Sequence, residues 1–208
     1  MALQMEKGVR ADQAADAALA MLLEKPRESA TIEAVAERAG LTYWQVHRFH
    51  GNSGNLYRAA AARLIQKIEA LIADAPTQAH ALGDGVRRYT MFVAEVMRSE
   101  AYAQFAYLLI RDRCVEPLLE EAYETRIAAP LRAGLEKLVR SLGLRQGAMI
   151  LLGVNSSRQF IKSLEAAFVL PRLLPGFDSA DAETASVAIR RVADRVVAES
   201  YVLGQQAA

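Results

Sequence analysis

The sequence predicts an all-α protein in which an N-terminal helix-turn-helix region of three helices precedes a larger region of six helices. Three observations support this fold class: apolar residues recur at helical spacing along nearly the whole chain, strand-like alternation is nearly absent, and glycine and proline fall between the periodic segments. The chain has 208 residues, 52% of them hydrophobic. This length suits one compact domain or a small domain fused to a larger one.

The first helix is expected over residues 9–25, because Pro26 stands just past the end of an alanine-rich stretch. A second, short helix is expected over 31–39, and Gly40 can supply the left-handed residue that ends it. The apolar residues of the second helix follow the i, i+3, i+4, i+7 spacing of a single helix face: Ile32, Val35, Ala36 and Ala39.

The third helix is expected over 42–49, where Thr42 and Gln45 have the T-x-x-Q spacing of a capping box. The polar run at 51–54 ends this helix, and a long helix with a steady apolar stripe is expected over 53–75. Five more helices are expected further along the chain, with Pro130 as a kink in the third of them: 79–98, 100–113, 115–142, 145–170 and 179–203.

The charge balance and the cysteine content limit the possible functions. The 25 basic and 24 acidic residues leave a net charge of +1, so bulk electrostatics gives no reason to expect a nucleic acid, a membrane surface or an acidic substrate. The single cysteine, Cys114, excludes an internal disulfide framework and is expected to be a small buried hydrophobe.

The N-terminus carries charges where a secretory signal has its apolar region, and the apolar runs fall far short of the roughly 18 residues of a membrane span. We therefore expect a cytoplasmic protein with no membrane partner.

The segments 31–39 and 42–49 form a predicted helix-turn-helix, since they are two short amphipathic helices joined by a tight turn. Its expected core consists of Ile32, Val35, Ala36, Leu41 and Val46. The remaining residues of the second helix carry planar and hydrogen-bonding groups, which suit the major groove of DNA better than a protein core. They are Tyr43, Trp44, Gln45, His47 and Arg48.

The segment TIEAVAERAGLT, from Thr31 to Thr42, resembles the DNA-binding domain of TetR-family repressors. The resemblance extends over about residues 10–60, and beyond Ala60 only the helical layout matches. It implies a helix-turn-helix DNA-binding domain over 1–56 and a helical regulatory domain over 57–208. In that family the last two long helices, here about 145–170 and 179–203, form a homodimer.

The resemblance also implies a set of DNA-binding residues: Thr31, Thr42, Tyr43, Trp44, Gln45, His47, Arg48 and Ser53. The family usually has glycine at the position of Trp44, tyrosine at that of His47 and lysine at that of Ser53. The family's tyrosine and lysine grip phosphates, and here His47 can donate to a phosphate, as Ser53 can more weakly with the help of nearby backbone N–H groups.

Residues 1–60 contain seven basic and seven acidic residues, so any positive field must come from uneven placement, with Arg10, Arg48 and Arg58 on one side. Non-specific DNA binding should be weak and salt-sensitive. Alternative structural roles remain open for three residues: Trp44 in the core of its own domain, Gln45 as a helix cap, and His50 as a half-buried, hydrogen-bonded imidazole. Tyr43 and Arg48 have the least competing structural explanation.

In the larger region, most aromatic residues at helical spacing are expected in the core. A few polar residues among them could make an apolar pocket with polar anchors, as small-molecule sites usually have. The candidate ligand-binding residues are Tyr89, Phe92, Phe105, Arg111, Tyr123, Asn155 and Gln159. Asn155 and Gln159 suit a dimer seam equally well.

The sequence therefore predicts a sequence-specific regulator of transcription, a repressor released by a small, mostly apolar effector. A homodimer would bind a near-palindromic double-stranded DNA operator, with the long helix 53–75 as the lever between the two regions. The alternative is a helical ligand-binding or scaffold protein with the same fold and weak or no DNA binding. An enzyme is disfavoured, because the chain lacks the glycine loops, metal-binding and nucleophile motifs of common enzymes, and no cofactor or metal is expected.

Overall fold

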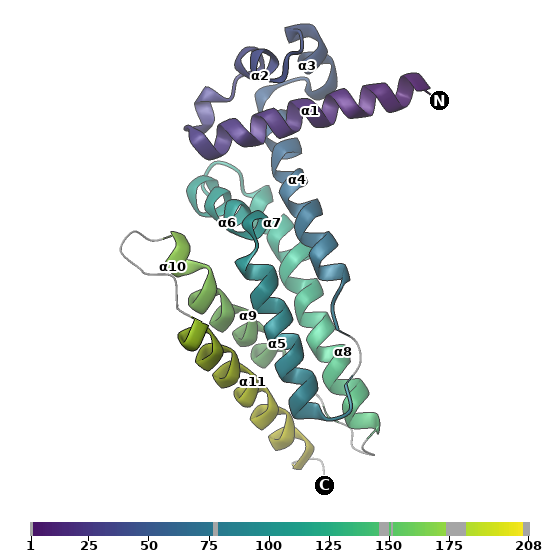
Figure 1. Ribbon diagram of the computed structural model, residues 1–208, viewed down its shortest axis with the longest axis vertical. Coiled ribbons are helices and arrows are strands. Elements are labelled where there is room, and N and C mark those ends of the chain that lie inside the picture. The colour runs from purple at the N-terminus through teal and green to yellow at the C-terminus, as the bar shows by residue number, and fades with distance from the viewer. Residues whose placement is uncertain (1, 77–78, 146–149, 151, 174–181, 206–208) are drawn as a thin grey trace.

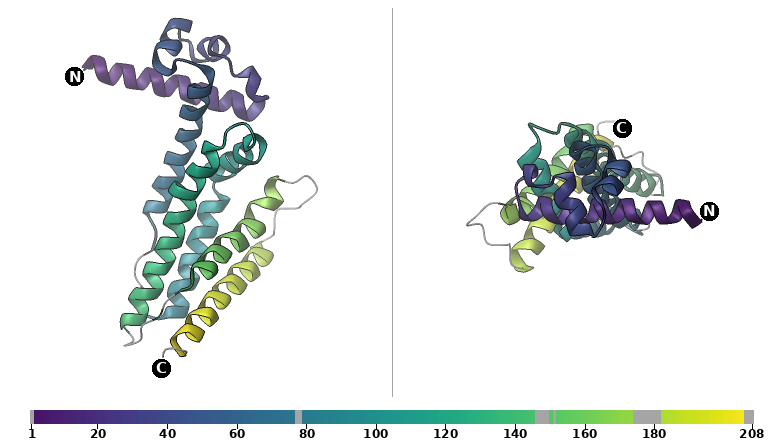
Figure 2. Two further views of the ribbon diagram at one scale, coloured as in Figure 1. Left: turned by 180° about the vertical axis from the view of Figure 1, so that it is seen from behind. Right: turned by 90° about the horizontal axis from the view of Figure 1, so that it is seen from above.

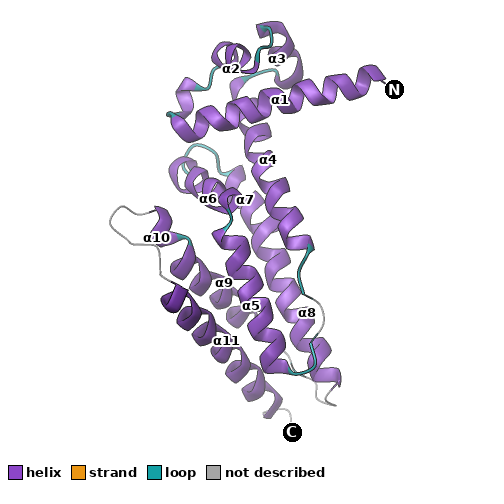
Figure 3. Ribbon diagram, in the orientation of Figure 1, coloured by secondary structure: helices purple, strands orange, loops and turns teal. Residues whose placement is uncertain are grey.

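The computed structural model describes the chain except for residues 1, 77–78, 146–149, 151, 174–181 and 206–208. Its described residues form helices joined by short loops and contain no strand (Figure 3), which confirms the predicted fold class. The molecule is elongated: the first three helices lie at one end, the fourth leads away from them, and the later helices form a bundle with it (Figure 1).

The first four helices occupy the residues of the predicted helix-turn-helix region and the long helix after it. They are α1 (Ala2–Glu24), α2 (Ile32–Ala39), α3 (Tyr43–His50) and α4 (Ser53–Ala73), with one 3₁₀ turn at Arg27–Ser29 after α1. The first helix begins at Ala2 rather than at residue 9.

The turn between α2 and α3 is defined by local hydrogen bonds. Gly40 has a φ of +65°, and its N–H donates back to the carbonyls of Ala36 and Glu37, which ends α2. Thr42 then caps α3, because its hydroxyl oxygen accepts from the N–H of Gln45 while the Gln45 side chain accepts from the N–H of Thr42. The predicted capping box is thus confirmed.

The core of the N-terminal region contains the residues that periodicity assigns to it. Ile32, Val35, Ala36 and Val46 are buried, and Leu41 is partly buried against the same cluster. Helix α1 crosses the start of α4 (Figures 1 and 2) and packs against α2, α3 and α4. Helix α3 packs against α1, α2 and α4 with one side, and its opposite side faces away from the rest of the molecule (Figure 1).

The larger region consists of the remaining helices, of which α5 packs against α8, α9 and α11. Their bounds are α5 (Leu82–Arg98), α6 (Glu100–Asp112), α7 (Leu118–Tyr123), α8 (Ala129–Arg145), α9 (Val154–Phe168), α10 (Leu170–Leu173) and α11 (Ala182–Gln205). Helices α9 and α11 pack side by side and form one flank of the molecule (Figures 1 and 2).

Three sequence predictions need correction in this region. The helix predicted over 115–142 starts at Leu118 and contains a π-helical stretch at Glu124–Ala128, just before Pro130. Proline lacks an N–H and its ring presses on the carbonyl four residues earlier, and the wider turns relieve that contact. The helix predicted over 145–170 begins only at Val154, with Gly153 in an extended conformation before it.

The third correction concerns Cys114, which is exposed rather than buried. It lies in the turn after α6, where the neighbouring acidic residues Asp112 and Glu116 take the inward positions instead. Hydrophobicity alone does not predict that the acids are buried and the cysteine exposed, because the burial of both acids depends on polar partners that include residues far away in sequence.

Candidate functional site

Helix α3 presents a largely polar and aromatic surface at the far end of the molecule (Figure 1). Val46, fully buried, anchors the helix, while the indole of Trp44 is 74% exposed and the ring of Tyr43 is 37% exposed. His47 and Arg48 are also exposed. The alternative that Trp44 fills the core of its own region is therefore wrong.

Three rings on α3 contact one another. The ring centroids of Tyr43 and His47 lie 5.6 Å apart in a stacked arrangement, and the edge of Trp44 meets Tyr43 at 5.4 Å. Trp44 and His47 are 6.3 Å apart. These contacts stay on the helix surface and bury little area, so they orient the rings without removing them from solvent.

Thr31, Thr42 and Ser53, three further predicted DNA-binding residues, lie at the starts of three helices. Thr31 caps α2 by accepting from the N–H of Ala34 at 3.2 Å, and Thr42 caps α3. Ser53 is exposed at the first position of α4. Gln45 is turned back toward Thr42, since its Oε1 accepts from the Thr42 N–H at 2.8 Å. The predicted helix-capping role of Gln45 is confirmed.

Arg48 and His50 have different surroundings. Arg48 makes no ion pair or hydrogen bond with any described residue, and it is exposed on α3. His50 is partly buried, and its Nε2 lies 3.3 Å from the carbonyl of Ala11. Burial lowers the pKa of His50 even though that hydrogen bond opposes the shift. The prediction of a half-buried, hydrogen-bonded imidazole is confirmed.

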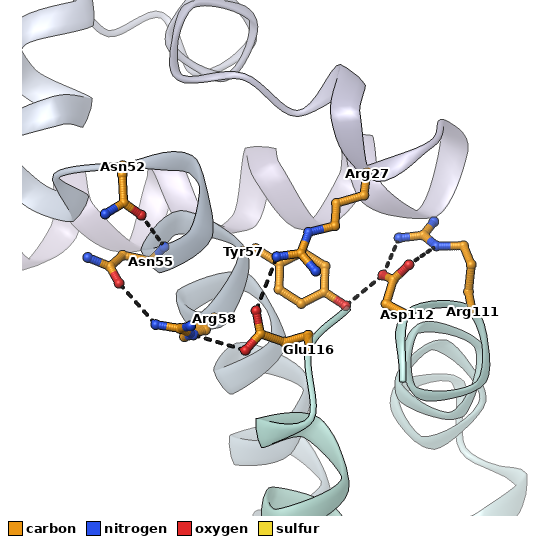
Figure 4. A network of polar contacts seen from close by, with 8 residues as sticks. All are labelled: Arg27, Asn52, Asn55, Tyr57, Arg58, Arg111, Asp112 and Glu116. Carbon is orange, nitrogen blue, oxygen red and sulfur yellow. Dashed lines mark hydrogen bonds and ion pairs between the residues drawn. The ribbon is translucent and has the colours of Figure 1, made fainter. Parts of the chain in front are cut away.

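A polar junction connects the N-terminal helices with α6 and the loop after it (Figure 4). We define the junction by six residues: Arg27, Tyr57, Arg58, Arg111, Asp112 and Glu116. Its two carboxylates are almost fully buried, with Asp112 4% exposed and Glu116 3% exposed. Buried carboxylates persist only where hydrogen bonds or ion pairs compensate them.

Asp112 occupies one half of the junction. Its Oδ2 accepts from the hydroxyl of Tyr57 at 2.7 Å, and Arg111 donates to both of its oxygens at 2.7 and 2.8 Å. Arg111 also donates to the carbonyl of Leu22 at the end of α1, at 2.6 Å. Burial by itself would raise the pKa of Asp112, but the hydrogen bonds from Arg111 and Tyr57 outweigh it and hold the pKa below its ordinary value.

Glu116 occupies the other half. Its two oxygens pair with Arg27 and Arg58, each at 3.1 Å. The guanidinium of Arg27 also lies 4.2 Å from the ring centroid of Tyr57, a cation–π contact that brings the two halves together. Arg58 therefore faces the larger region, which corrects the expectation that it lies with Arg48 on the outer side.

Sequence reasoning missed this junction, apart from Arg111, which it assigned to a ligand pocket. The available signal was weak: two acids four residues apart, Asp112 and Glu116, among arginines in a segment flanked by apolar runs. Apart from Arg111, their partners lie more than 50 positions away in sequence, in the 3₁₀ turn and α4. Without an alignment or a structure, nothing pairs those positions.

A cavity of about 440 Å³ lies in the larger region between α6, α7, α9 and α10. Its wall is mostly apolar, and it also contains one aromatic and four charged side chains. The lining residues are Ala106, Leu109, Ile110, Arg113, Glu120, Tyr123, Lys162, Glu165, Ala166, Val169 and Leu170. This volume is within the usual range for small-molecule sites.

Of the predicted ligand-binding residues, the structure brings only Tyr123 to this cavity. Phe105 is buried in the core, Phe92 packs partly against it, and Arg111 belongs to the junction. Tyr89 is a core residue whose hydroxyl donates to the carbonyl of Leu131 at 2.7 Å. The phenol end of Tyr89 lies so close to Gly134 that a larger residue there would have to displace it.

Asn155 and Gln159 are exposed on α9, near the flank that α9 shares with α11. A shallow groove of about 410 Å³ runs between these two helices and is lined by alanines and two arginines, Arg191 and Arg195. Val154 on α9 and Val187 on α11 are also exposed. The flank thus leaves apolar side chains uncovered, although each helix already packs against the core with another face.

Neither a metal centre nor a membrane anchor is found in the described part of the chain. Its His, Cys, Asp and Glu side chains form no group of three or more that could hold a metal ion. Among the helices described, none combines the length and hydrophobicity needed to span a bilayer.

Comparisons with solved structures define the class of fold. A candidate TetR-family transcriptional regulator from Mesorhizobium loti MAFF303099 superposes with a TM-score of 0.73 at 15% sequence identity, covering 92% of this chain and 96% of that chain. A TetR-family transcriptional regulator from Streptomyces coelicolor superposes with a TM-score of 0.59 at 17% identity, covering 92% and 90%.

The chain therefore has the all-α fold of TetR-family regulators, with a helix-turn-helix at one end. The structures it is similar to are described as transcriptional regulators, not as enzymes. No protein-family model and no curated protein matches its sequence.

Proposed function

We propose that this protein is a cytoplasmic TetR-family regulator that binds a specific double-stranded DNA operator as a homodimer and is released by a small, mostly apolar effector. The observation that carries the proposal is the outer side of α3, where planar and hydrogen-bonding groups face solvent at the tip of a helix-turn-helix. Residues 1–56 are the DNA-binding unit of this proposal and residues 57–208 the regulatory unit.

The residues of α3 divide into base-reading and backbone-contacting groups. Arg48 is exposed and unpaired in the described structure, and a guanidinium can bind the O6 and N7 atoms of guanine with two hydrogen bonds. The indole of Trp44 suits apolar contact with a thymine methyl group. Tyr43 and His47 are placed for phosphates, together with the hydroxyls of Thr31, Thr42 and Ser53 at three helix starts.

Gln45 has a conditional role in this proposal. Its amide oxygen is held by Thr42, so it can read a base only by giving up half of the capping box. A cap is worth about 1 kcal/mol, which a good base contact can offset.

Dimerisation through α9 and α11 would place two copies of α3 on one side of the assembly. The exposed side chains of Val154 and Val187 and the groove between the helices support this surface, since an apolar face in water favours burial against a partner. A two-fold dimer matches a near-palindromic operator, with recognition helices about 34–36 Å apart or somewhat more.

Coupling between effector and DNA would run through α6. One side of α6 lines the cavity, and its last residue, Asp112, binds Tyr57 on α4. A ligand that displaced α6 would act on the junction and hence on the position of α4 and the helices before it. It could shift the equilibrium only by its difference in affinity for the two arrangements.

A second candidate function is a ligand-binding or scaffold protein with the same fold and little DNA binding. The balanced charge of residues 1–60 and the engagement of Arg58 with Glu116 favour it, because both reduce the positive field toward DNA.

The test is selection of bound sequences from random double-stranded DNA, followed by fluorescence anisotropy on the enriched site at two salt concentrations. We expect an enriched, near-palindromic site bound by two chains, with affinity that falls as salt rises. Arg140→Ala, which removes an exposed positive charge on α8, is the control and should bind like the wild type. Failure of any sequence to enrich at low salt would favour the scaffold function.

A further inference from the structure

We propose that the cavity between α6, α7, α9 and α10 binds an amphipathic molecule with an apolar body and a positively charged amine, and that Glu165 binds the amine. The cavity and this chemistry follow from the geometry alone. The inference rests on the proposed function only where it makes this molecule the effector that changes DNA binding.

Glu165 is held in place by two hydroxyls from two other helices. Its Oε1 accepts from Tyr102 on α6 at 2.9 Å and from Tyr123 on α7. Burial raises the pKa of both tyrosines above the ordinary value, with the charge of Glu165 adding to the shift. Both hydroxyls therefore stay protonated and donate, and the carboxylate receives both donors.

Both donors use the same oxygen, which leaves the other for a ligand. Among the described residues, none donates a hydrogen bond to Oε2 of Glu165. This oxygen is also not one of the described side-chain atoms that are buried without a partner. Glu165 is also part of the cavity lining. A carboxylate oriented by two tyrosines beside an apolar cavity offers a fixed acceptor, and an ammonium group is the donor that best compensates its charge.

The other charged lining residues do not reverse this preference. Arg113 and Lys162 are exposed, pair with no described carboxylate, and have long side chains that can extend into water. Glu120 is exposed as well and adds a second negative charge to the lining. An anionic ligand would have to bring its charge close to the two glutamates, whereas an ammonium group is attracted by both.

The rest of the cavity suits an apolar body. Leu109, Ile110 and Val169 line it together with the methyl groups of Ala106 and Ala166. The ring of Tyr123 adds an aromatic face, which attracts a cation in addition to packing against apolar surface. An occupant would contact α6 along the turns that precede Asp112, the residue that holds Tyr57 in the junction.

The test uses three probes with one apolar body and different head groups: 2-naphthylmethylamine, 2-naphthalenemethanol and 2-naphthoate. Binding is measured by isothermal titration calorimetry at neutral pH. We expect the amine to bind about tenfold more tightly than the alcohol, because a hydrogen bond between two charged groups is stronger than one to a neutral hydroxyl. The carboxylate should bind most weakly.

Glu165→Gln keeps the size of the side chain and an oxygen for the two tyrosines but removes the charge. It should bind the amine about tenfold less tightly and the alcohol unchanged. Glu121→Gln is the matched control, because Glu121 is exposed on α7 outside the cavity lining, and it should behave like the wild type.

Equal affinities for amine and alcohol in the wild type, no binding of any probe, or a preference that survives Glu165→Gln would each overturn the inference. If Glu165→Gln does not fold, the three probes on the wild-type protein decide alone. Adding the amine to the complex with the selected operator separates the two proposals. A protein that binds the amine through Glu165 but enriches no DNA supports this site and contradicts the proposed function, and DNA binding without probe binding does the reverse.

Discussion

The outer side of α3 and the junction between α4 and α6 use the same kinds of side chain in opposite ways. Each contains tyrosine and arginine, but α3 contains no acidic residue, whereas the junction contains Asp112 and Glu116. Around these two carboxylates the tyrosine and each arginine of the junction donate to a carboxylate oxygen, although Nη1 of Arg27 is buried without a partner. On α3, Tyr43 is only stacked and Arg48 has no described partner.

The two regions therefore differ in whether buried carboxylates are present: the junction has them and is a structural cluster, whereas the outer side of α3 lacks them and is free to bind a partner. In the junction, the protein itself supplies the donors for both carboxylates, so those residues contribute to stability and to the position of α4. On α3, completing them requires another molecule. The two regions should respond to mutation in different measurements, one in stability and the other in binding.

The largest expected effect is on the junction. Asp112→Ala leaves the Tyr57 hydroxyl and the Arg111 guanidinium without their shared acceptor, and we expect a loss of about 3 kcal/mol in the free energy of unfolding. Urea denaturation followed by circular dichroism measures it. Glu69→Ala, which removes a half-exposed partner of Arg126, is the control and should cost at most about 1 kcal/mol. Equal losses in both variants would contradict a special role for the junction.

The next effect is on DNA binding through α3. Arg48→Ala should weaken binding to the selected operator by about 2 kcal/mol, or roughly thirtyfold, and relax the preference at one base pair. Its melting temperature should match that of the wild type, because Arg48 has no described partner to lose. Anisotropy titrations on the operator and on single-base variants distinguish the cases. Equal weakening on all sequences would show that Arg48 contacts phosphate instead of a base.

Tyr43 should have a smaller effect of the same kind. Tyr43→Ala should reduce DNA affinity by about 1 kcal/mol, the usual net value of one hydrogen bond, with no change in thermal stability. Tyr43→Phe keeps the ring that stacks on His47 and removes only the hydroxyl, so similar losses in the two variants would assign the effect to the hydroxyl. A large drop in melting temperature for Tyr43→Ala would make Tyr43 a structural residue.

The smallest effect concerns the pH dependence of stability. Because burial lowers the pKa of His50, the unfolded chain takes up a proton below about pH 6.5, whereas the folded protein takes it up only at a lower pH. Folding stability should therefore fall as the pH drops below that value. His50→Phe removes this term, so melting temperatures at pH 7.5 and 5.5 should differ less for the variant than for the wild type. Equal differences would show that His50 is not responsible.

The success of the sequence predictions depended on how local the controlling interactions were. The turn between α2 and α3 was predictable, since Gly40, Thr42 and Gln45 act within a few residues of one another. The break before Val154 was not, because the apolar residues on both sides follow one helical period. A mostly apolar pocket was predicted, but of the seven residues assigned to it only Tyr123 lines the cavity, since periodicity cannot tell a core face from a cavity wall.

By itself, the sequence determined the helical fold class, the caps of the helix-turn-helix and the outward position of Tyr43 and Arg48, because these depend on spacing and on contacts within one or two helical turns. Only the tertiary structure decided that Arg58 and Arg111 join buried acids rather than DNA or a ligand, and that Tyr102 and Tyr123 meet at Glu165. The physical reason is that a charged or polar side chain is compatible with burial or exposure until its partner, which lies far away in sequence, is known.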